Sequence, residues 1–121
     1  MVKNFHELII WEKATDFYKE LILILPSFPK GERDCLIPQI RRASLSISNN
    51  IAEGCGRGSN QNLKYFLLIA FGSAKEVENM LFLSKKLSYI DEDVLNKLNF
   101  KIQEIEKMLF SFIKNLGIKE N

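Results

Sequence analysis

Apolar residues recur at three- and four-residue steps in four separate stretches of this chain, a spacing that is typical of amphipathic helices. The expected helices run from about His6 to Leu25, Asp34 to Gly54, Ser59 to Leu87 and Asp91 to Leu116. No stretch alternates in the manner of a strand, so the fold class is predicted to be all-α. Four amphipathic helices with short connections predict an antiparallel up-down-up-down four-helix bundle, formed by residues 1–121 as a single domain.

Proline, glycine and capping residues mark the expected helix ends. Pro26 and Pro29 follow the first helix, because proline disfavours helical geometry in the residue before it. Asp34 and Asp91 are expected to cap the second and fourth helices, and Ser59 or Asn60 the third. Gly54 is expected to end the second helix in a left-handed conformation, and Gly72 to allow a neighbouring helix to approach closely.

The first helix has more apolar residues than one face can hold. Its expected core positions are Leu8, Trp11, Thr15, Tyr18, Ile22 and Leu25. Phe5, Ile9, Ile10 and Phe17 remain, and the sequence FLLIAF at 66–71 wraps around the third helix. Apolar surface on two sides of a helix predicts burial on both, and self-association provides that burial.

The stretch 39–59, QIRRASLSISNNIAEGCGRGS, has helical periodicity but unusual residues. Ile37, Ile40, Ser44, Ile47 and Ile51 fall on one side of the expected helix. A polar row falls on the opposite side: Arg42, Ser46, Asn49 and Glu53. Asn and Ser are weak helix formers, so their presence in mid-helix needs another explanation. Two interpretations remain open: small and polar residues at a subunit interface, or a surface that contacts a ligand or polynucleotide.

The turn at 54–59, GCGRGS, leads into the third helix. It is not a P-loop, because no Gly-Lys-Ser/Thr follows and no strand precedes it. Its backbone amides and Arg57 can hold a phosphate at the start of that helix, or the turn is a glycine connector without a ligand.

The basic residues are unevenly placed. The net charge is only +2, but all four arginines lie between Arg33 and Arg57. The stretch from Arg33 to Lys64 holds five basic and two acidic residues. Arginine suits bidentate contacts to phosphate or carboxylate, so these arginines either bind phosphates or pair within the protein.

Few residues suit catalysis or metal binding. His6 is the single histidine, whereas triads and metal sites need histidine held by other groups. Cys35 and Cys55 lie near opposite ends of one helix, too far apart for a disulfide. The chain lacks a secretory signal and an apolar run of about 20 residues. We expect a cytoplasmic, non-enzymatic protein without cofactor, metal or membrane.

Several stretches resemble one known family. They are FHELIIWEKATDFYKEL at 5–21, LIPQIRRASLSISNNIAEGCGRGS at 36–59 and FLLIAFGSAKEVENML at 66–81. They look like the four-helix bundles encoded in bacterial 23S rRNA intervening sequences. The accessory variability determinant of diversity-generating retroelements, a basic pentamer that binds nucleic acid, is similar in fold.

The resemblance implies a homopentameric ring and nucleic-acid contacts by Arg41, Arg42 and Arg57. Asn50, Glu53 and Gly54 match the family's most regular motif, whose role is unknown.

Our hypothesis from the sequence is therefore an oligomer that binds structured RNA through Arg41, Arg42, Arg57 and Lys64. The alternative is a protein-interaction scaffold or accessory subunit without direct nucleic-acid binding. A third possibility, a small phosphate-handling enzyme, is disfavoured by the missing acid–base residues.

Overall fold

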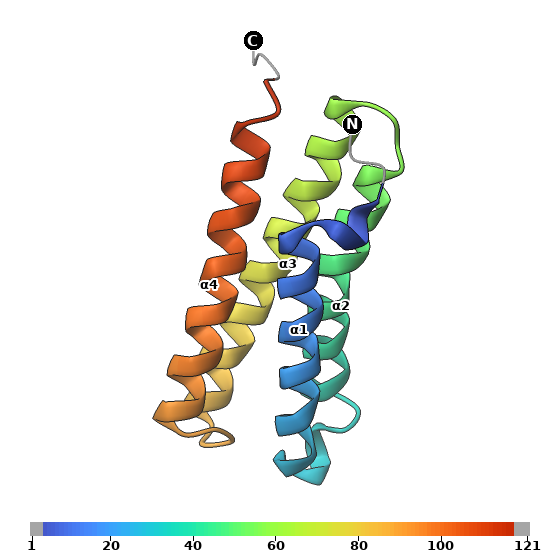
Figure 1. Cartoon of the computed structure of the whole chain (residues 1–121). Coiled ribbons are helices and arrows are strands. Elements are labelled where there is room, and N and C mark those ends of the chain that lie inside the picture. The colour runs from blue at the N-terminus through green and yellow to red at the C-terminus, as the bar shows by residue number, and fades with distance from the viewer. Residues whose placement is uncertain (1–3, 118–121) are drawn as a thin grey trace.

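Four α-helices make up most of the structure, a computed structural model that describes residues 4–117. They are α1 (Ile9–Ile24), α2 (Leu36–Cys55), α3 (Asn60–Lys86) and α4 (Glu92–Lys114). Single 3-10 turns, η1 (Phe5–Glu7), η2 (Leu25–Ser27) and η3 (Lys30–Glu32), accompany them. The helices lie side by side and alternate in direction (Figure 1). Residues 4–117 contain no strand, so the predicted all-α four-helix bundle is confirmed.

Each helix packs against the next one along the chain, and α4 also packs against α1. The most extensive of these contacts joins α2 to α3. Short connections keep consecutive helices adjacent and antiparallel. Within residues 4–117, no helix has the length and apolar character that crossing a membrane requires.

Two of the three predicted caps are present. Ser59 Oγ accepts a hydrogen bond from the backbone N–H of Asn62 at 3.2 Å, and Asp91 Oδ1 from that of Val94 at 2.9 Å. The prediction for Asp34 is wrong, because α2 begins one residue later, after Cys35. Glu32 Oε1 accepts the hydrogen bond from Leu36 N instead, at 3.3 Å.

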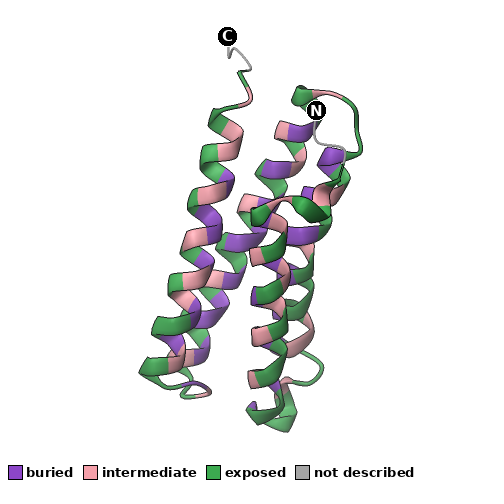
Figure 2. Cartoon of the chain, in the orientation of Figure 1, coloured by how far each residue is buried: buried purple, intermediate pink, exposed green. Residues whose placement is uncertain are grey.

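Four of the five positions predicted on the inward side of α2 are buried and Ile37 is half-buried, but α1 differs from its prediction. Its buried residues are Ile10, Ala14, Phe17 and Leu21, as the burial colouring indicates (Figure 2). The predicted core residues Trp11 and Tyr18 are half-buried and Ile22 is exposed. Because α1 is apolar on more than one side, its periodicity alone does not select the face that packs inward.

Gly54 lies inside the last turn of α2 and is buried, so the predicted left-handed helix end at this position is wrong. A Cβ at position 54 would lie 3.0 Å from both Leu63 Cδ1 and Phe66 Cβ of α3. The missing side chain therefore lets the two helices approach closely. Left-handed geometry occurs at Gly58, with φ +84°, within the connector to α3. The expectation for Gly72 is also wrong, because this residue is exposed and a Cβ there would meet nothing within 4 Å.

The two helical glycines provide a matched pair of substitutions. Gly54→Ala forces α2 and α3 apart, and crowding of this kind costs about 1–3 kcal/mol, against a gain in helix propensity of up to about 1 kcal/mol. We expect the free energy of unfolding to fall by about 1 kcal/mol in urea titrations. Gly72→Ala should raise it by about 0.5–1 kcal/mol, because only the helix propensity changes. Equal effects at both positions would contradict the close approach at Gly54.

A group of charged side chains is packed between α3 and α4. Glu106 is 6% exposed, and its Oε1 lies 3.0 Å from Lys75 Nζ. Lys75 Nζ is also 3.2 Å from Glu78 Oε1, and Gln103 Nε2 donates to Glu78 Oε2 at 3.1 Å. Glu106 Oε2 has no hydrogen-bond partner among residues 4–117.

The two carboxyl groups of this cluster have pKa values shifted in opposite directions. Burial raises the pKa of Glu106, the ion pair with Lys75 opposes this effect, and the neighbouring Glu78 adds to it. Burial alone would also raise the pKa of Glu78, but hydrogen bonds from Gln103, Glu106 and Lys75 lower it overall. Of the two carboxyl groups, Glu106 therefore holds a proton more readily than Glu78 does.

The raised pKa of Glu106 makes the stability of the fold depend on pH. Because the folded state raises the pKa of this carboxyl group above its ordinary value of 4.5, folding favours the protonated form, and that stabilisation is lost as the pH rises through the folded pKa. Glu106→Gln stays neutral, so its stability relative to the wild type should increase as the pH is raised from about 4.5 towards neutrality. Urea titrations at several pH values measure this difference. Glu12→Gln removes an exposed carboxylate of α1, and the same trend in that variant would indicate a net-charge effect instead.

Candidate nucleic-acid interface on α2

The outer face of α2 contains a groove of about 550 Å³. Three arginines, two asparagines, one serine and three apolar residues line it: Arg33, Ile37, Pro38, Arg41, Arg42, Leu45, Ser46, Asn49 and Asn50. These residues fall in two rows of four-residue steps, which places their side chains on one side of the helix. In the part of the chain that the structure describes, the groove is lined by three positive charges and no carboxylate.

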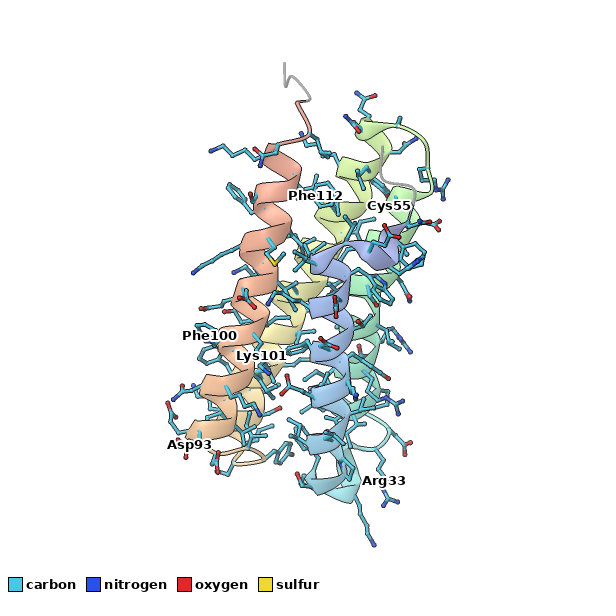
Figure 3. The ribbon with its side chains drawn as sticks, viewed as in Figure 1. Arg33, Cys55, Asp93, Phe100, Lys101 and Phe112 are labelled. Atoms are coloured by element: carbon cyan, nitrogen blue, oxygen red, sulfur yellow. The ribbon has the colours of Figure 1, made fainter. Side chains whose placement is uncertain are left out.

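The three arginines of this α2 groove are exposed but differ in their hydrogen-bond partners. Arg41 donates from both Nε and Nη2 to the hydroxyl oxygen of Tyr18 on α1, each at 3.2 Å. These two bonds orient the guanidinium without neutralising its charge. Arg33 and Arg42 form no hydrogen bond or ion pair with residues 4–117, so their charges are uncompensated by a direct partner. Figure 3 shows Arg33 at the end of the bundle where α2 begins, opposite the end that carries Cys55.

Arg57 belongs to a neighbouring hollow of about 370 Å³, lined by Asn49, Ala52, Glu53, Gly56 and Arg57. Its Nη2 lies 2.8 Å from Glu53 Oε1, and its guanidinium carbon lies 5.0 Å from the ring centroid of Phe66. The guanidinium of Arg57 thus forms an ion pair with the Glu53 carboxylate and a cation–π contact with the Phe66 ring. The sequence prediction grouped Arg57 with Arg41 and Arg42, whereas the structure gives it a separate, nearly neutral surface that shares only Asn49 with the groove.

A hydrogen bond between Ser46 and Ser73 joins α2 to α3, and Asn50 of α2 donates to the same Ser46. Asn50 Nδ2 donates to Ser46 O at 2.7 Å and to Ser46 Oγ at 2.9 Å. Ser73 of α3 donates to the same Ser46 Oγ at 2.8 Å. The polar row predicted opposite the core is therefore interrupted: Ser46 is half-buried against α3, while Arg42, Asn49 and Glu53 are exposed.

The remaining candidate residues lie elsewhere. Lys64 is half-buried in the first turns of α3 and lines neither hollow. Cys55 is buried, and burial raises the pKa of its thiol. The exposed His6 stacks edge-on against Phe5 at 5.5 Å between ring centroids. Residues 4–117 hold no cluster of three or more His, Cys, Asp or Glu side chains suited to a metal ion.

Sequence reasoning did not assign Arg33 and Leu45 to the site. Arg33 precedes α2, and Leu45 resembles an ordinary apolar position. The signal that would have found Leu45 is the four-residue spacing of 37, 41, 45 and 49, whereas Arg33 lies in the turn before α2, where helical spacing does not apply.

Comparisons with known proteins support both the four-helix fold and the family resemblance noted in the sequence. A crystal structure of a protein with unknown function from the S23 ribosomal protein family of Bacteroides thetaiotaomicron VPI-5482 has a TM-score of 0.81 and 28% sequence identity. The alignment covers 88% of this chain and 100% of that one. No curated protein matches. The family model described as 23S rRNA-intervening sequence protein matches residues 6–111. The chain thus belongs to the 23S rRNA-intervening sequence protein family.

Proposed function

We propose that this protein binds structured RNA through the α2 groove, as an oligomer and without catalysing a reaction. The observation that carries the proposal is the groove itself, where Arg33, Arg41 and Arg42 meet with no carboxylate in the lining. Phosphates dominate the affinity of proteins for nucleic acid, and arginine binds them with two donors at once.

The extent of the groove favours a polymer over a small anion. Its lining runs from residue 33 to residue 50, about 25 Å along a helix that rises about 1.5 Å per residue. A single phosphate needs only one binding site, whereas three arginines along one side of α2 can contact successive phosphates of an RNA strand. The family description names 23S rRNA, which makes fragments of that RNA the first ligands to test. Such a role belongs in the cytoplasm, where ribosomal RNA is found.

Exposed apolar side chains support self-association. Among the largest exposures are those of Ile9, Leu23, Leu68, Phe82, Phe100 and Phe110. Phe100 is 71% exposed and Phe110 61%, unusually high for phenylalanine, and burying them between copies would remove apolar surface from water. A ring uses two different patches of each subunit and repeats the α2 groove around its axis. Repetition multiplies the phosphate contacts of a subunit that is only mildly basic.

The oligomer has a definite expected mass. Five copies of the 14.0 kDa chain give a homopentamer, which light scattering coupled to gel filtration measures directly. Phe100→Asp should lower the mass if this residue lies between subunits, because a buried, unpaired carboxylate destabilises an interface. A wild-type chain that elutes as a monomer at all concentrations would exclude the ring.

The RNA-binding test compares two triple variants that remove equal charge. We expect Arg33→Ala/Arg41→Ala/Arg42→Ala to weaken filter binding of 23S rRNA fragments by at least about tenfold at low salt. The slope of log affinity against log salt should fall by about 2 to 3, since three phosphate contacts are lost. Lys86→Ala/Lys107→Ala/Lys114→Ala, which removes three exposed lysines of α3 and α4, should change both quantities much less.

Two results would contradict RNA binding at the α2 groove. If the wild-type protein binds no RNA at low salt, the proposed RNA-binding function is wrong. Equal losses in the two triple variants would mean that overall charge attracts the RNA without a defined site.

A protein-interaction scaffold is the second candidate, favoured by the same exposed phenylalanines of α4. It predicts a protein partner whose binding falls with Phe110→Asp and survives the triple arginine change. RNA affinity would then be weak and insensitive to that change.

A further inference from the structure

The α2 groove combines apolar surface with its positive charge. Leu45 is 40% exposed within it, and Ile37 and Pro38 are half-buried beside the arginines. Contacts to the backbone of paired RNA use phosphates and 2′-hydroxyls and need no apolar wall. An unpaired nucleotide does present both chemistries, because its base has flat apolar faces and its backbone carries phosphates. The mixed lining therefore favours a nucleotide whose base is free of pairing.

Asn49 supplies a free amide at the same place. It is exposed, lies one helical turn beyond Leu45, and forms no hydrogen bond with residues 4–117. The neighbouring Asn50 differs, since its amide nitrogen is engaged by Ser46. Asparagine in mid-helix costs about 0.5 kcal/mol relative to alanine, and nothing within the described chain compensates for it at Asn49. Its donor and acceptor stand side by side, which suits the hydrogen-bonding edge of a base.

Arg41 adds a flat cation that is already oriented. The two hydrogen bonds to Tyr18 restrain rotation of the guanidinium, so less freedom is lost when a base stacks on it. Guanidinium planes serve as stacking partners for unpaired bases in RNA recognition. Arg33 and Arg42, which have no internal partner, remain available for the flanking phosphates.

We infer that the α2 groove receives an unpaired nucleotide of RNA, with the base against Leu45 and Arg41 and its edge hydrogen-bonded by Asn49. The preferred substrate class is thus RNA with a bulge or loop, and fully paired RNA binds more weakly. This inference rests on the proposed RNA-binding function and adds selectivity to it.

The test uses two RNAs with equal numbers of phosphates, one a perfect duplex and one with a bulge of unpaired nucleotides. Wild-type protein should bind the bulged RNA about tenfold more tightly in fluorescence anisotropy titrations, given the stacking of one base. Asn49→Ala and Leu45→Ala should each remove most of this preference, because they weaken the bulged RNA far more than the duplex. Arg42→Ala should weaken both RNAs to the same extent, because it removes a phosphate contact.

Matched controls and a competitor sharpen the result. Asn96→Ala and Leu83→Ala change an exposed asparagine of α4 and a leucine of α3 that is exposed to the same extent as Leu45, and should leave the preference intact. Circular dichroism and thermal midpoints confirm that each variant folds. Adenosine monophosphate should displace the bulged RNA at lower concentration than ribose 5-phosphate, because only the former carries a base.

The outcomes separate the inference from the function. If Arg42→Ala weakens binding but Asn49→Ala and Leu45→Ala leave the preference unchanged, RNA binding stands and the base site is wrong. Wild-type protein that binds both RNAs equally is also against the base site. If neither RNA binds at low salt, the proposed function fails and the inference fails with it. Displacement of RNA by an acidic phosphopeptide, with no displacement by adenosine monophosphate, would assign the groove to a protein ligand.

Discussion

The close contact between α2 and α3 is the constraint on which the rest of the structure depends. Gly54 leaves room for Leu63 and Phe66 at one end of this contact, and the Ser46–Ser73 hydrogen bond joins the helices nearer its middle. Both features fix the rotation of α2 about its axis. With the isoleucines turned inward and Ser46 turned towards α3, the arginines and Asn49 necessarily face outward. The groove is a consequence of how α2 packs.

The side of the bundle where α1 meets α4 is held in a different way. Ion pairs bridge these helices, between Lys13 and Glu104 and between Glu20 and Lys101, and their side chains are partly exposed. Hydrogen bonding to Lys101 lowers the pKa of Glu20, in line with this pairing. Partly exposed ion pairs contribute little individually to stability. The bundle thus has its most extensive helix contact between α2 and α3, and ion pairs add to a smaller contact between α1 and α4.

The sequence predicted what depends on local pattern and missed what depends on contacts between helices. The isoleucine positions of α2 and the caps at Ser59 and Asp91 follow from spacing and side-chain chemistry, and the structure has them. The inward face of α1 does not follow, because apolar residues surround that helix. Gly54 was assigned to a helix end, because the sequence of α2 alone does not indicate that α3 approaches closely at this residue. Glu53 and Arg57 are four residues apart, so their pairing was one of the alternatives that the sequence left open, whereas the contact of Arg57 with Phe66 of α3 depends on how the helices meet.

The α2 groove is built on a single helix and the turn before it, so its register is set by the helix alone. Inserting one residue between Arg42 and Asn49 would rotate Asn49 by about 100° and carry it away from the arginines, whereas insertions in the connectors would leave their relation intact. Helix length between these positions is consequently constrained by the α2 groove as well as by the core. In relatives of this chain, that segment should vary in residue type but keep its number of residues.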